Sequence, residues 1–185
     1  MRVFFDCEFT GLHQDTTLVS VGCVAESGET FYAECMDYDR LQVDDWLRAN
    51  VIAHLQLTEE WEREGRLNGS TFEGVVGTRA WAAQNLASWL SQWDHVEMWG
   101  DCLAYDWVLF CELFGGGAEC LPRNVSYIPF DLCTLFKLHG VDPDISRATF
   151  SRVVGTKHHA LDDALMIRAC VQKLLPAQDT PGAPL

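Results

Sequence analysis

The chain has 185 residues, 48% of them hydrophobic, and a formal net charge of -14 at pH 7. This length fits one domain with a filled apolar core. No apolar run approaches the roughly 18 residues of a membrane span, and the first residues lack a signal-peptide pattern, so we expect no membrane association. We predict one domain over residues 1–175 and a disordered tail over residues 176–185.

Three strands are expected near the N-terminus. Residues 2–9 form an apolar, aromatic run, and residues 17–25 and 29–35 form two further runs of strand type. Ser27-Gly28 separates the last two runs and is typical of a tight turn. The pattern predicts a three-strand meander.

Two helices are expected next, over residues 43–55 and 79–93, because both stretches have helical spacing of apolar residues. The stretch between them, residues 59–77, is polar and contains glycine. We predict an exposed loop with some helix there.

The second half of the chain alternates strands and helices. Strands are expected at residues 96–99 and 125–130, and helices at 107–114, 132–138 and 160–175. The order βββαβαβα indicates an α/β sandwich with a mixed sheet.

The charge is unevenly spread along the chain. Residues 1–122 carry 6 basic and 21 acidic side chains, whereas residues 123–173 carry 7 basic and 5 acidic ones. An acidic protein can still meet nucleic acid through bound divalent cations, which supply positive charge where the phosphate lies. We expect a short or single-stranded end as the partner.

The cysteines and tryptophans give two further expectations. The eight cysteines include no C-x-x-C pair and mostly lie in apolar stretches, which is typical of a reducing, cytoplasmic environment. Trp81, Trp89 and Trp93 can pack in the core or line a homodimer interface, since aromatic residues favour such surfaces.

Asp6 and Glu8 interrupt an otherwise apolar strand of the type that is covered on both faces. At positions i and i+2 their side chains project from the same face, roughly 6–7 Å apart at the backbone. This separation suits carboxylates that share or flank a metal ion. On spacing alone, a solvent-facing or salt-bridged pair at a strand end explains them equally well.

Asp163 lies within the apolar stripe of the last predicted helix, three residues after Ala160. A buried carboxylate requires a cation, a hydrogen-bond network or a proton. Its neighbour Asp162 falls about 100° away around the helix and is expected to face solvent. Asp106 is expected at a helix start, where an acidic residue is also favoured by the helix dipole alone.

Together these four carboxylates predict a site for two Mg²⁺ or Mn²⁺ ions, because hard oxygen ligands select such ions over zinc. Two ions of this kind activate a water and stabilise the leaving oxygen in phosphodiester hydrolysis. His158, in the loop before the last helix, is a candidate to accept the proton from that water. Adjacent His159 is the competing candidate, and its simplest interpretation is a surface imidazole.

Three segments resemble the DEDDh 3′-to-5′ exonucleases, a family with the RNase H-like fold. Residues 4–12 (FFDCEFTGL) match the first family motif, Tyr105-Asp106 the second, and residues 158–163 (HHALDD) the third. The third motif selects His158 over His159. The resemblance spans nearly the whole chain and implies a mixed central sheet flanked by helices, with release of nucleoside 5′-monophosphates from a free 3′ end.

Within that family the sequence is similar to a small bacterial and phage subgroup of exoribonucleases, which implies RNA as the substrate. The family pattern also implies that Glu8, Phe9, Thr10 and Leu12 bind the terminal nucleotide. A purely structural role of Phe9 in a buried strand is the alternative. Many relatives have Asn shortly before the second acidic position, where this chain has Asp101-Cys102.

Two other functions fit the same residues. One is a 3′-to-5′ exonuclease on single-stranded DNA, because telling RNA from DNA depends on contacts to the 2′-hydroxyl that can come from backbone groups. The other is a nuclease-like binding module without catalysis. A structural protein with solvated acids does not account for Asp163 in an apolar stripe.

Overall fold

The structure, a computed structural model, describes residues 1–57, 65–69 and 71–175. The strands are β1 (Arg2–Phe9), β2 (Leu18–Ala25), β3 (Thr30–Cys35), β4 (Gly65–Asn68), β5 (Phe72–Gly77), β6 (Glu97–Gly100) and β7 (Phe130–Asp131). The α-helices are α1 (Asp45–Asn50), α2 (Arg79–Leu90), α3 (Asp106–Leu113), α4 (Leu132–Leu138), α5 (Arg147–Ser151) and α6 (Ala160–Leu174). Short 3₁₀ turns cover Arg40–Gln42, Ile52–His54 and Ala118–Cys120.

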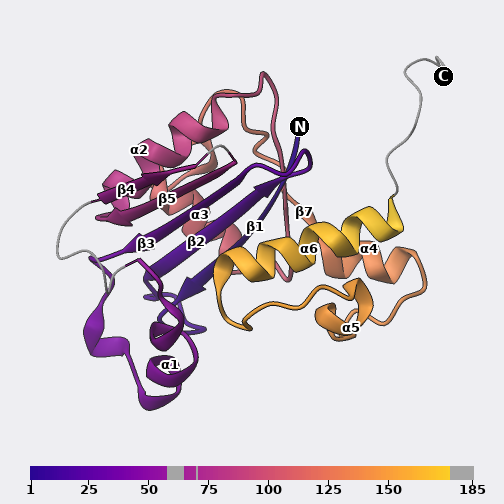
Figure 1. Cartoon of the computed structure of the whole chain (residues 1–185), viewed down its shortest axis with the longest axis horizontal. Helices are drawn as coiled ribbons and strands as arrows, with labels where there is room; N and C mark the ends of the chain where they lie inside the picture. The colour runs from indigo at the N-terminus through magenta and orange to yellow at the C-terminus, as the bar shows by residue number, and fades with distance from the viewer. Residues whose placement is uncertain (58–64, 70, 176–185) are drawn as a thin grey trace.

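The seven strands form one mixed sheet in the order β4-β5-β3-β2-β1-β6-β7 (Figure 1). The predicted meander is confirmed, because β2 pairs antiparallel with both β1 and β3. Strand β6 then joins the other edge of β1 in parallel, and β7 pairs in parallel with β6. The predicted α/β fold with a mixed sheet flanked by helices, as the RNase H-like resemblance implied, is confirmed.

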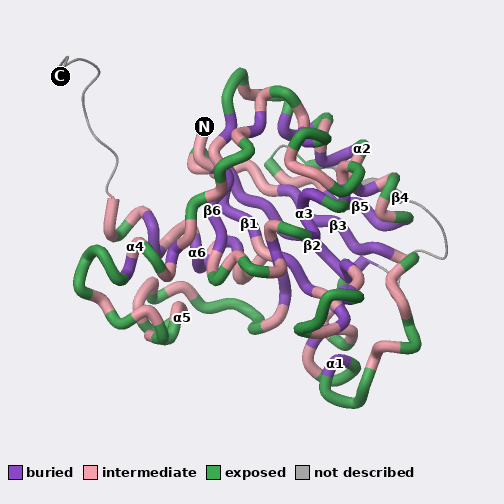
Figure 2. The backbone as a smooth tube through the Cα atoms, turned by 180° about the vertical axis from the view of Figure 1, so that it is seen from behind, coloured by how far each residue is buried: buried purple, intermediate pink, exposed green. Residues whose placement is uncertain are grey.

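Helices cover both faces of the sheet. Helix α6 packs on β1 and β2 from one side, whereas α2 and α3 pack from the other (Figure 1). The central strands are therefore buried along most of their length (Figure 2).

Side chains of β1 alternate between these two layers. Val3 and Phe5 belong to the core under α2 and α3, whereas Phe4 belongs to the core under α6. Because strand side chains alternate with period two, Asp6 and Glu8 share the face of Phe4 and point toward α6. The fold thus directs both acids of β1 at the helix that carries Asp163.

The predicted loop over residues 59–77 was wrong for its second half. Residues 65–68 and 72–77 form β4 and β5, and β5 pairs in parallel with β3. The period-two signal is weak there because Gly74 and Gly77 flank only two valines. Residues 59–64 and residue 70, which complete this prediction, lie outside the described part of the chain, as does the tail over residues 176–185.

Other element boundaries also differ from the predictions. The helix expected at residues 43–55 is divided into α1 and a 3₁₀ turn, and the strand expected at 125–130 is reduced to a Val125 bridge and β7. Pro129 lacks a backbone N–H and limits pairing in that segment. Helix α5 has five residues and was not predicted.

The structure bears on two expectations, the absence of a membrane span and the placement of the tryptophans. No helix among the described residues has the length and hydrophobicity needed to cross a membrane. Trp89 is only 4% exposed and packs on Phe31 and Trp93 inside the chain's own core, so it cannot line a homodimer interface. Trp81 and Trp93 are partly buried against the same core.

Candidate active site

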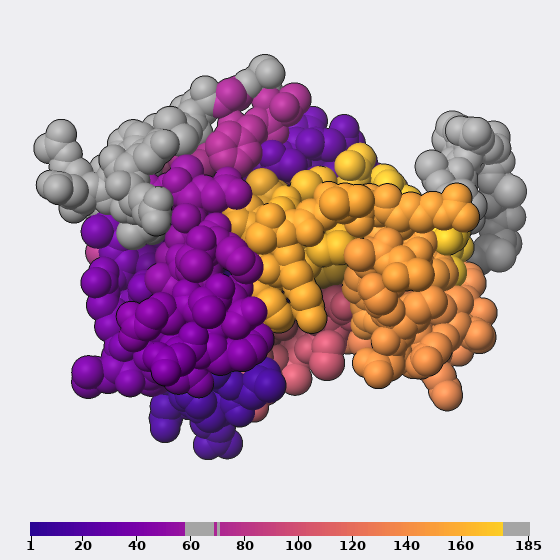
Figure 3. Space-filling model, turned by 60° about the horizontal axis from the view of Figure 1, so that its bottom comes forward, coloured from indigo at the N-terminus to yellow at the C-terminus, as the bar shows by residue number. Residues whose placement is uncertain are grey.

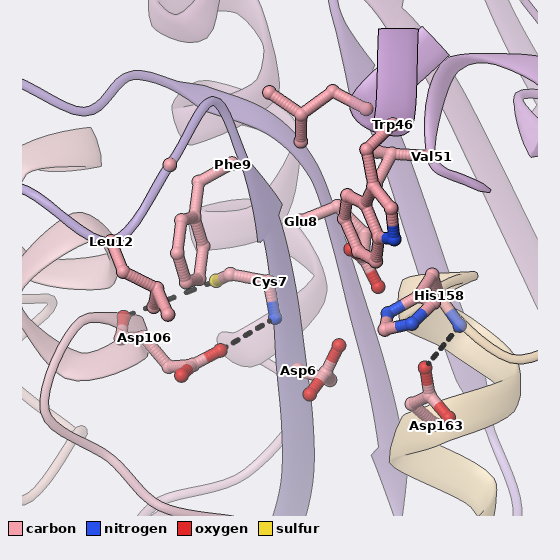
Figure 4. A pocket seen from close by; sticks show the side chains of 12 residues that line it. Asp6, Cys7, Glu8, Phe9, Leu12, Trp46, Val51, Asp106, His158 and Asp163 are labelled. Atoms are coloured by element: carbon pink, nitrogen blue, oxygen red, sulfur yellow. Dashed lines mark hydrogen bonds between the residues drawn. The ribbon is translucent and has the colours of Figure 1, made fainter. Parts of the chain in front are cut away.

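Three of the four predicted metal ligands meet at one point. One carboxylate oxygen each from Asp6, Glu8 and Asp163 lies within 4.8 Å of the other two. Asp6 and Glu8 come from the second half of β1, and Asp163 comes from the first turn of α6 (Figure 4). The cluster therefore joins residues that are more than a hundred positions apart in the sequence.

Gly22 allows α6 to come this close to the sheet. A Cβ atom at this position would lie 2.3 Å from the Leu161 backbone nitrogen and 2.5 Å from the Ala160 carbonyl oxygen. Gly22 pairs with Asp6 across β1 and β2, so the helix start sits directly beside the acids of β1. No side chain larger than hydrogen fits between them without movement.

Asp106 is the first residue of α3, and it lines one cavity together with Asp6, Glu8 and Asp163. Its Oδ1 atom accepts a hydrogen bond of 2.9 Å from the Cys7 backbone N–H, which fixes the carboxylate beside β1. It is not part of the group of three within 4.8 Å. Figure 4 shows the Asp6 carboxylate between those of Asp106 and Asp163.

Burial and mutual repulsion raise the pKa values of these acids. Burial first, and then the charges of Asp106, Glu8 and Asp163, raise the pKa of Asp6 well above its ordinary value. Burial, followed by the charges of Asp163 and Asp106, raises the pKa of Glu8 to about 8. Burial also raises the pKa values of Asp106 and Asp163 to about 6 each. Such a set of oxygen donors is electrostatically suited to a divalent cation.

His158 lies at the edge of this cluster. Its backbone N–H donates a 3.0 Å hydrogen bond to Oδ2 of Asp163, and its φ of 60° is in the left-handed region. The imidazole meets the Trp46 ring edge-on, with 5.1 Å between ring centroids. Burial, with smaller effects from Lys157 and His54, lowers the pKa of His158. The neutral imidazole that a proton acceptor needs is thus favoured.

The interpretation of His159 as a surface imidazole was wrong. It is 4% exposed, and its ring packs at a tilt against Tyr32 with 4.7 Å between the ring centroids. Its side chain caps α6 by accepting a hydrogen bond from the Asp162 backbone N–H. Asp162 also differs from expectation, since its side chain is only 28% exposed and accepts a 2.8 Å hydrogen bond from the Thr156 backbone N–H. His159 and Asp162 therefore fix the conformation of the segment that leads into α6.

The residues expected to bind the terminal nucleotide divide into two groups. Glu8, Phe9 and Leu12 line a cavity of about 290 Å³ that contains the carboxylates, and Leu12 is 77% exposed. Thr10 does not line it, because its side chain is buried and hydrogen-bonded to the turn at Thr17. Its role is to hold the β1–β2 connection.

Trp46 completes the far wall of this cavity and was not predicted from the sequence. Trp46 lies on the short helix α1 next to His158 (Figure 4), and it is 53% exposed. The available signal was a tryptophan directly after two acidic residues, in Asp44-Asp45-Trp46. A half-exposed aromatic ring in a cavity wall provides a stacking surface for a base.

Asp101, at a position where the DEDDh resemblance would place Asn, is held in an ion pair. Arg147 donates to its two carboxylate oxygens at 2.5 and 2.8 Å. These two residues line a second cavity of about 370 Å³, which shares His158 and Asp163 with the first. The carboxylate cluster therefore lies between two hollows.

Comparisons with known proteins identify the family to which the chain belongs. A family model described as the 3′-5′ exoribonuclease Rv2179c-like domain matches residues 1–175. The chain is 30% identical over 144 residues to 3′-5′ exoribonuclease Rv2179c of Mycobacterium tuberculosis strain H37Rv, with 76% of each chain covered. The same identity and coverage hold for 3′-5′ exoribonuclease MT2234.1 of Mycobacterium tuberculosis strain CDC 1551 / Oshkosh. The chain belongs to the Rv2179c-like 3′-5′ exoribonuclease domain family.

Proposed function

We propose that this chain hydrolyses RNA from its 3′ end and releases nucleoside 5′-monophosphates, by a two-metal mechanism of the DEDDh type. The observation that carries the proposal is the convergence of Asp6, Glu8 and Asp163 within 4.8 Å, with His158 hydrogen-bonded to Asp163. Family membership supplies the reaction and the RNA substrate.

The donor set fits two Mg²⁺ or Mn²⁺ ions. Asp6, Glu8 and Asp163 would hold one ion, and Asp6 together with Asp106 would hold the second. The ligands are all carboxylate oxygens, which select hard cations over zinc. When bound, such ions supply the positive charge that activates a water and stabilises the leaving oxygen.

His158 would accept the proton from the attacking water at an imidazole nitrogen. It lines the carboxylate cavity from the loop side, outside the group of three carboxylates. Its lowered pKa keeps the ring neutral at pH 7. A neutral imidazole within reach of the water is the usual requirement for general base catalysis.

The cavity around Glu8, Phe9, Leu12 and Trp46 would receive the terminal nucleotide. Trp46 and Leu12 present exposed apolar surface on which a base can pack. Phe9 lines the same cavity, and its ring centroid lies 5.7 Å from that of Tyr105. This arrangement leaves the scissile phosphate beside the carboxylates.

We also propose that residues 1–175 form one catalytic domain and that it works in the cytoplasm. One sheet connects β1 to β7, and the family model spans the same residues. All eight cysteines are free, and five of them are buried. Free cysteines in apolar positions are typical of a reducing compartment.

The proposal is tested with matched RNA and DNA single strands of one sequence, incubated with the purified chain and Mn²⁺. We expect the RNA to yield nucleoside 5′-monophosphates, identified by mass spectrometry. Preferential hydrolysis of the DNA strand would support the DNA exonuclease instead. Binding of RNA without any product would support the non-catalytic module.

A further inference from the structure

The second cavity lies beside the carboxylate cluster and is not needed for the terminal nucleotide. Its walls come from the start of α5, the loop before α6, and α6 itself. In Figure 3, the orange residues around α5 and the purple residues around α1 lie on either side of the segment that leads into α6. Because both cavities are lined by His158 and Asp163, they adjoin at the catalytic cluster.

The charges of the two cavities differ. Four carboxylates line the first cavity, and none of its described lining residues is lysine or arginine. The second cavity contains Arg147 and Lys157 together with Asp101 and Asp163. A path from the first cavity to the second therefore leads from acidic surroundings to surroundings in which two acidic side chains are balanced by two basic ones.

Arg147 lines the second cavity, but its guanidinium N–H groups are already hydrogen-bonded within the protein and are not available to a ligand. Besides its two bonds to Asp101, its guanidinium donates to the carbonyl oxygens of Pro143 at 2.8 Å and Ile145 at 2.6 Å. This arrangement cancels the Asp101 charge, which would otherwise repel an anion. It also fixes the start of α5.

Lys157 is the cation that remains available. It is exposed, and within the described part of the chain its ammonium forms no ion pair. Ser146 lines the same cavity; its Oγ atom accepts from the Thr149 backbone N–H, which leaves its own proton free to donate. An ammonium and a hydroxyl in one hollow are suited to phosphate oxygens.

We propose that the second cavity binds the nucleotide that precedes the scissile phosphate, with Lys157 and Ser146 contacting that nucleotide's 5′ phosphate. This inference rests on the proposed function. Hydrolysis that releases a 5′-monophosphate breaks the bond from phosphorus to the 3′ oxygen of the preceding nucleotide. With the terminal nucleotide in the first cavity, the preceding one must lie on the other side of His158 and Asp163.

Two dinucleotides that differ by a single phosphate test the inference. The dinucleotide NpN has the scissile phosphate only, whereas pNpN carries in addition a 5′ phosphate on its first nucleotide. We expect kcat/KM of the wild-type chain to be higher for pNpN, mainly through KM. Lys157→Gln should reduce the ratio of the two kcat/KM values by about three- to tenfold. This factor lies between the contribution of a solvent-exposed ion pair and that of a hydrogen bond to a charged group.

Two variants serve as controls. Lys157→Arg keeps the charge and should retain most of the advantage. Lys137→Gln makes the same charge change at an exposed lysine of α4 that does not line the cavity, and should behave as wild type.

The outcomes separate this inference from the proposed function. If the wild-type chain cleaves both dinucleotides equally well, or if Lys157→Gln lowers kcat/KM for both by the same factor, the cavity does not bind the 5′ phosphate and the inference is wrong. If the wild-type chain cleaves neither dinucleotide nor a longer RNA with Mg²⁺ or Mn²⁺, the proposed function is wrong as well.

Discussion

Gly22 of β2 lies directly under Ala160 at the start of α6, so closely that a Cβ atom on Gly22 would be 2.5 Å from the Ala160 carbonyl oxygen. This contact sets the height of α6 above the sheet. It thereby sets the position of Asp163 relative to Asp6 and Glu8. A glycine in a strand is explained here by close approach of another backbone.

The first prediction follows from this contact. Gly22→Ala should push α6 away from β2, destabilise the fold by about 1–3 kcal/mol and weaken metal binding, as overpacking of a tight contact does. Urea unfolding and titration of the purified variant with Mn²⁺ measure both effects. Gly69→Ala is the matched control, because its Cβ would come no closer than 3.4 Å to a neighbouring atom. Unchanged Mn²⁺ affinity in a folded Gly22→Ala variant would show that the contact does not position Asp163.

The two adjacent histidines should have separable roles. His158→Asn keeps a residue that tolerates the left-handed backbone but cannot accept the proton, so kcat should fall by roughly 10² to 10⁴ with stability near wild type. His159→Asn keeps a side chain able to cap α6 but loses the ring packed on Tyr32, so stability should fall while most of kcat remains. Steady-state kinetics and thermal unfolding of both variants decide the assignment. The reverse pattern would make His159 the base.

Metal binding should release protons at neutral pH. Burial and repulsion hold the pKa of Glu8 at about 8 in the metal-free protein, so at pH 7 this carboxyl is largely protonated. A cation must displace that proton, and its apparent affinity should therefore rise between pH 6 and pH 8. Calorimetric titrations with Mn²⁺ at pH 7, in two buffers of different ionisation enthalpy, count the protons released. Identical heats in the two buffers would contradict the prediction.

The same pKa shift predicts how the metal-free protein responds to pH. The folded pKa of Glu8 lies above its ordinary value of 4.5, so its contribution to stability is present at low pH and is lost as pH rises through about 8. Thermal unfolding in EDTA should thus occur at lower temperature at pH 8 than at pH 6. Added Mn²⁺ should reverse much of this loss, and Glu8→Gln should remove the Glu8 contribution to the pH dependence. A metal-free protein equally stable at both pH values would be inconsistent with a repulsive cluster.

The positions of three of the four acids could be predicted because each of them interrupts a local pattern, whereas Asp106 at a helix start does not. Asp6 and Glu8 break an apolar strand, and Asp163 lies in the apolar stripe of a helix, so local periodicity alone marks them as unusual. The structure brings these three together. The meander and the last helix were predicted correctly for the same reason.

Features that depend on contacts between distant segments could not be predicted. The Asp101–Arg147 ion pair joins residues 46 positions apart, and neither has a local pattern that marks it. Buried Glu34 accepts from the backbone N–H groups of Gln56 and Leu57, at 2.6 and 2.9 Å, yet in the sequence it is an ordinary strand acid. The burial of His159 likewise arises from Tyr32 on a different element.

The most direct test of the central claim follows the digestion of a 5′-labelled single-stranded RNA by the purified chain with Mn²⁺. We predict a ladder of products that shorten one nucleotide at a time from the 3′ end, with no digestion in excess EDTA or by Asp163→Asn. Asp162→Asn, which changes the neighbouring carboxyl outside the group of three, should retain most of the activity. Cleavage at internal positions from the earliest times, or an undiminished ladder in EDTA or with Asp163→Asn, would contradict the account.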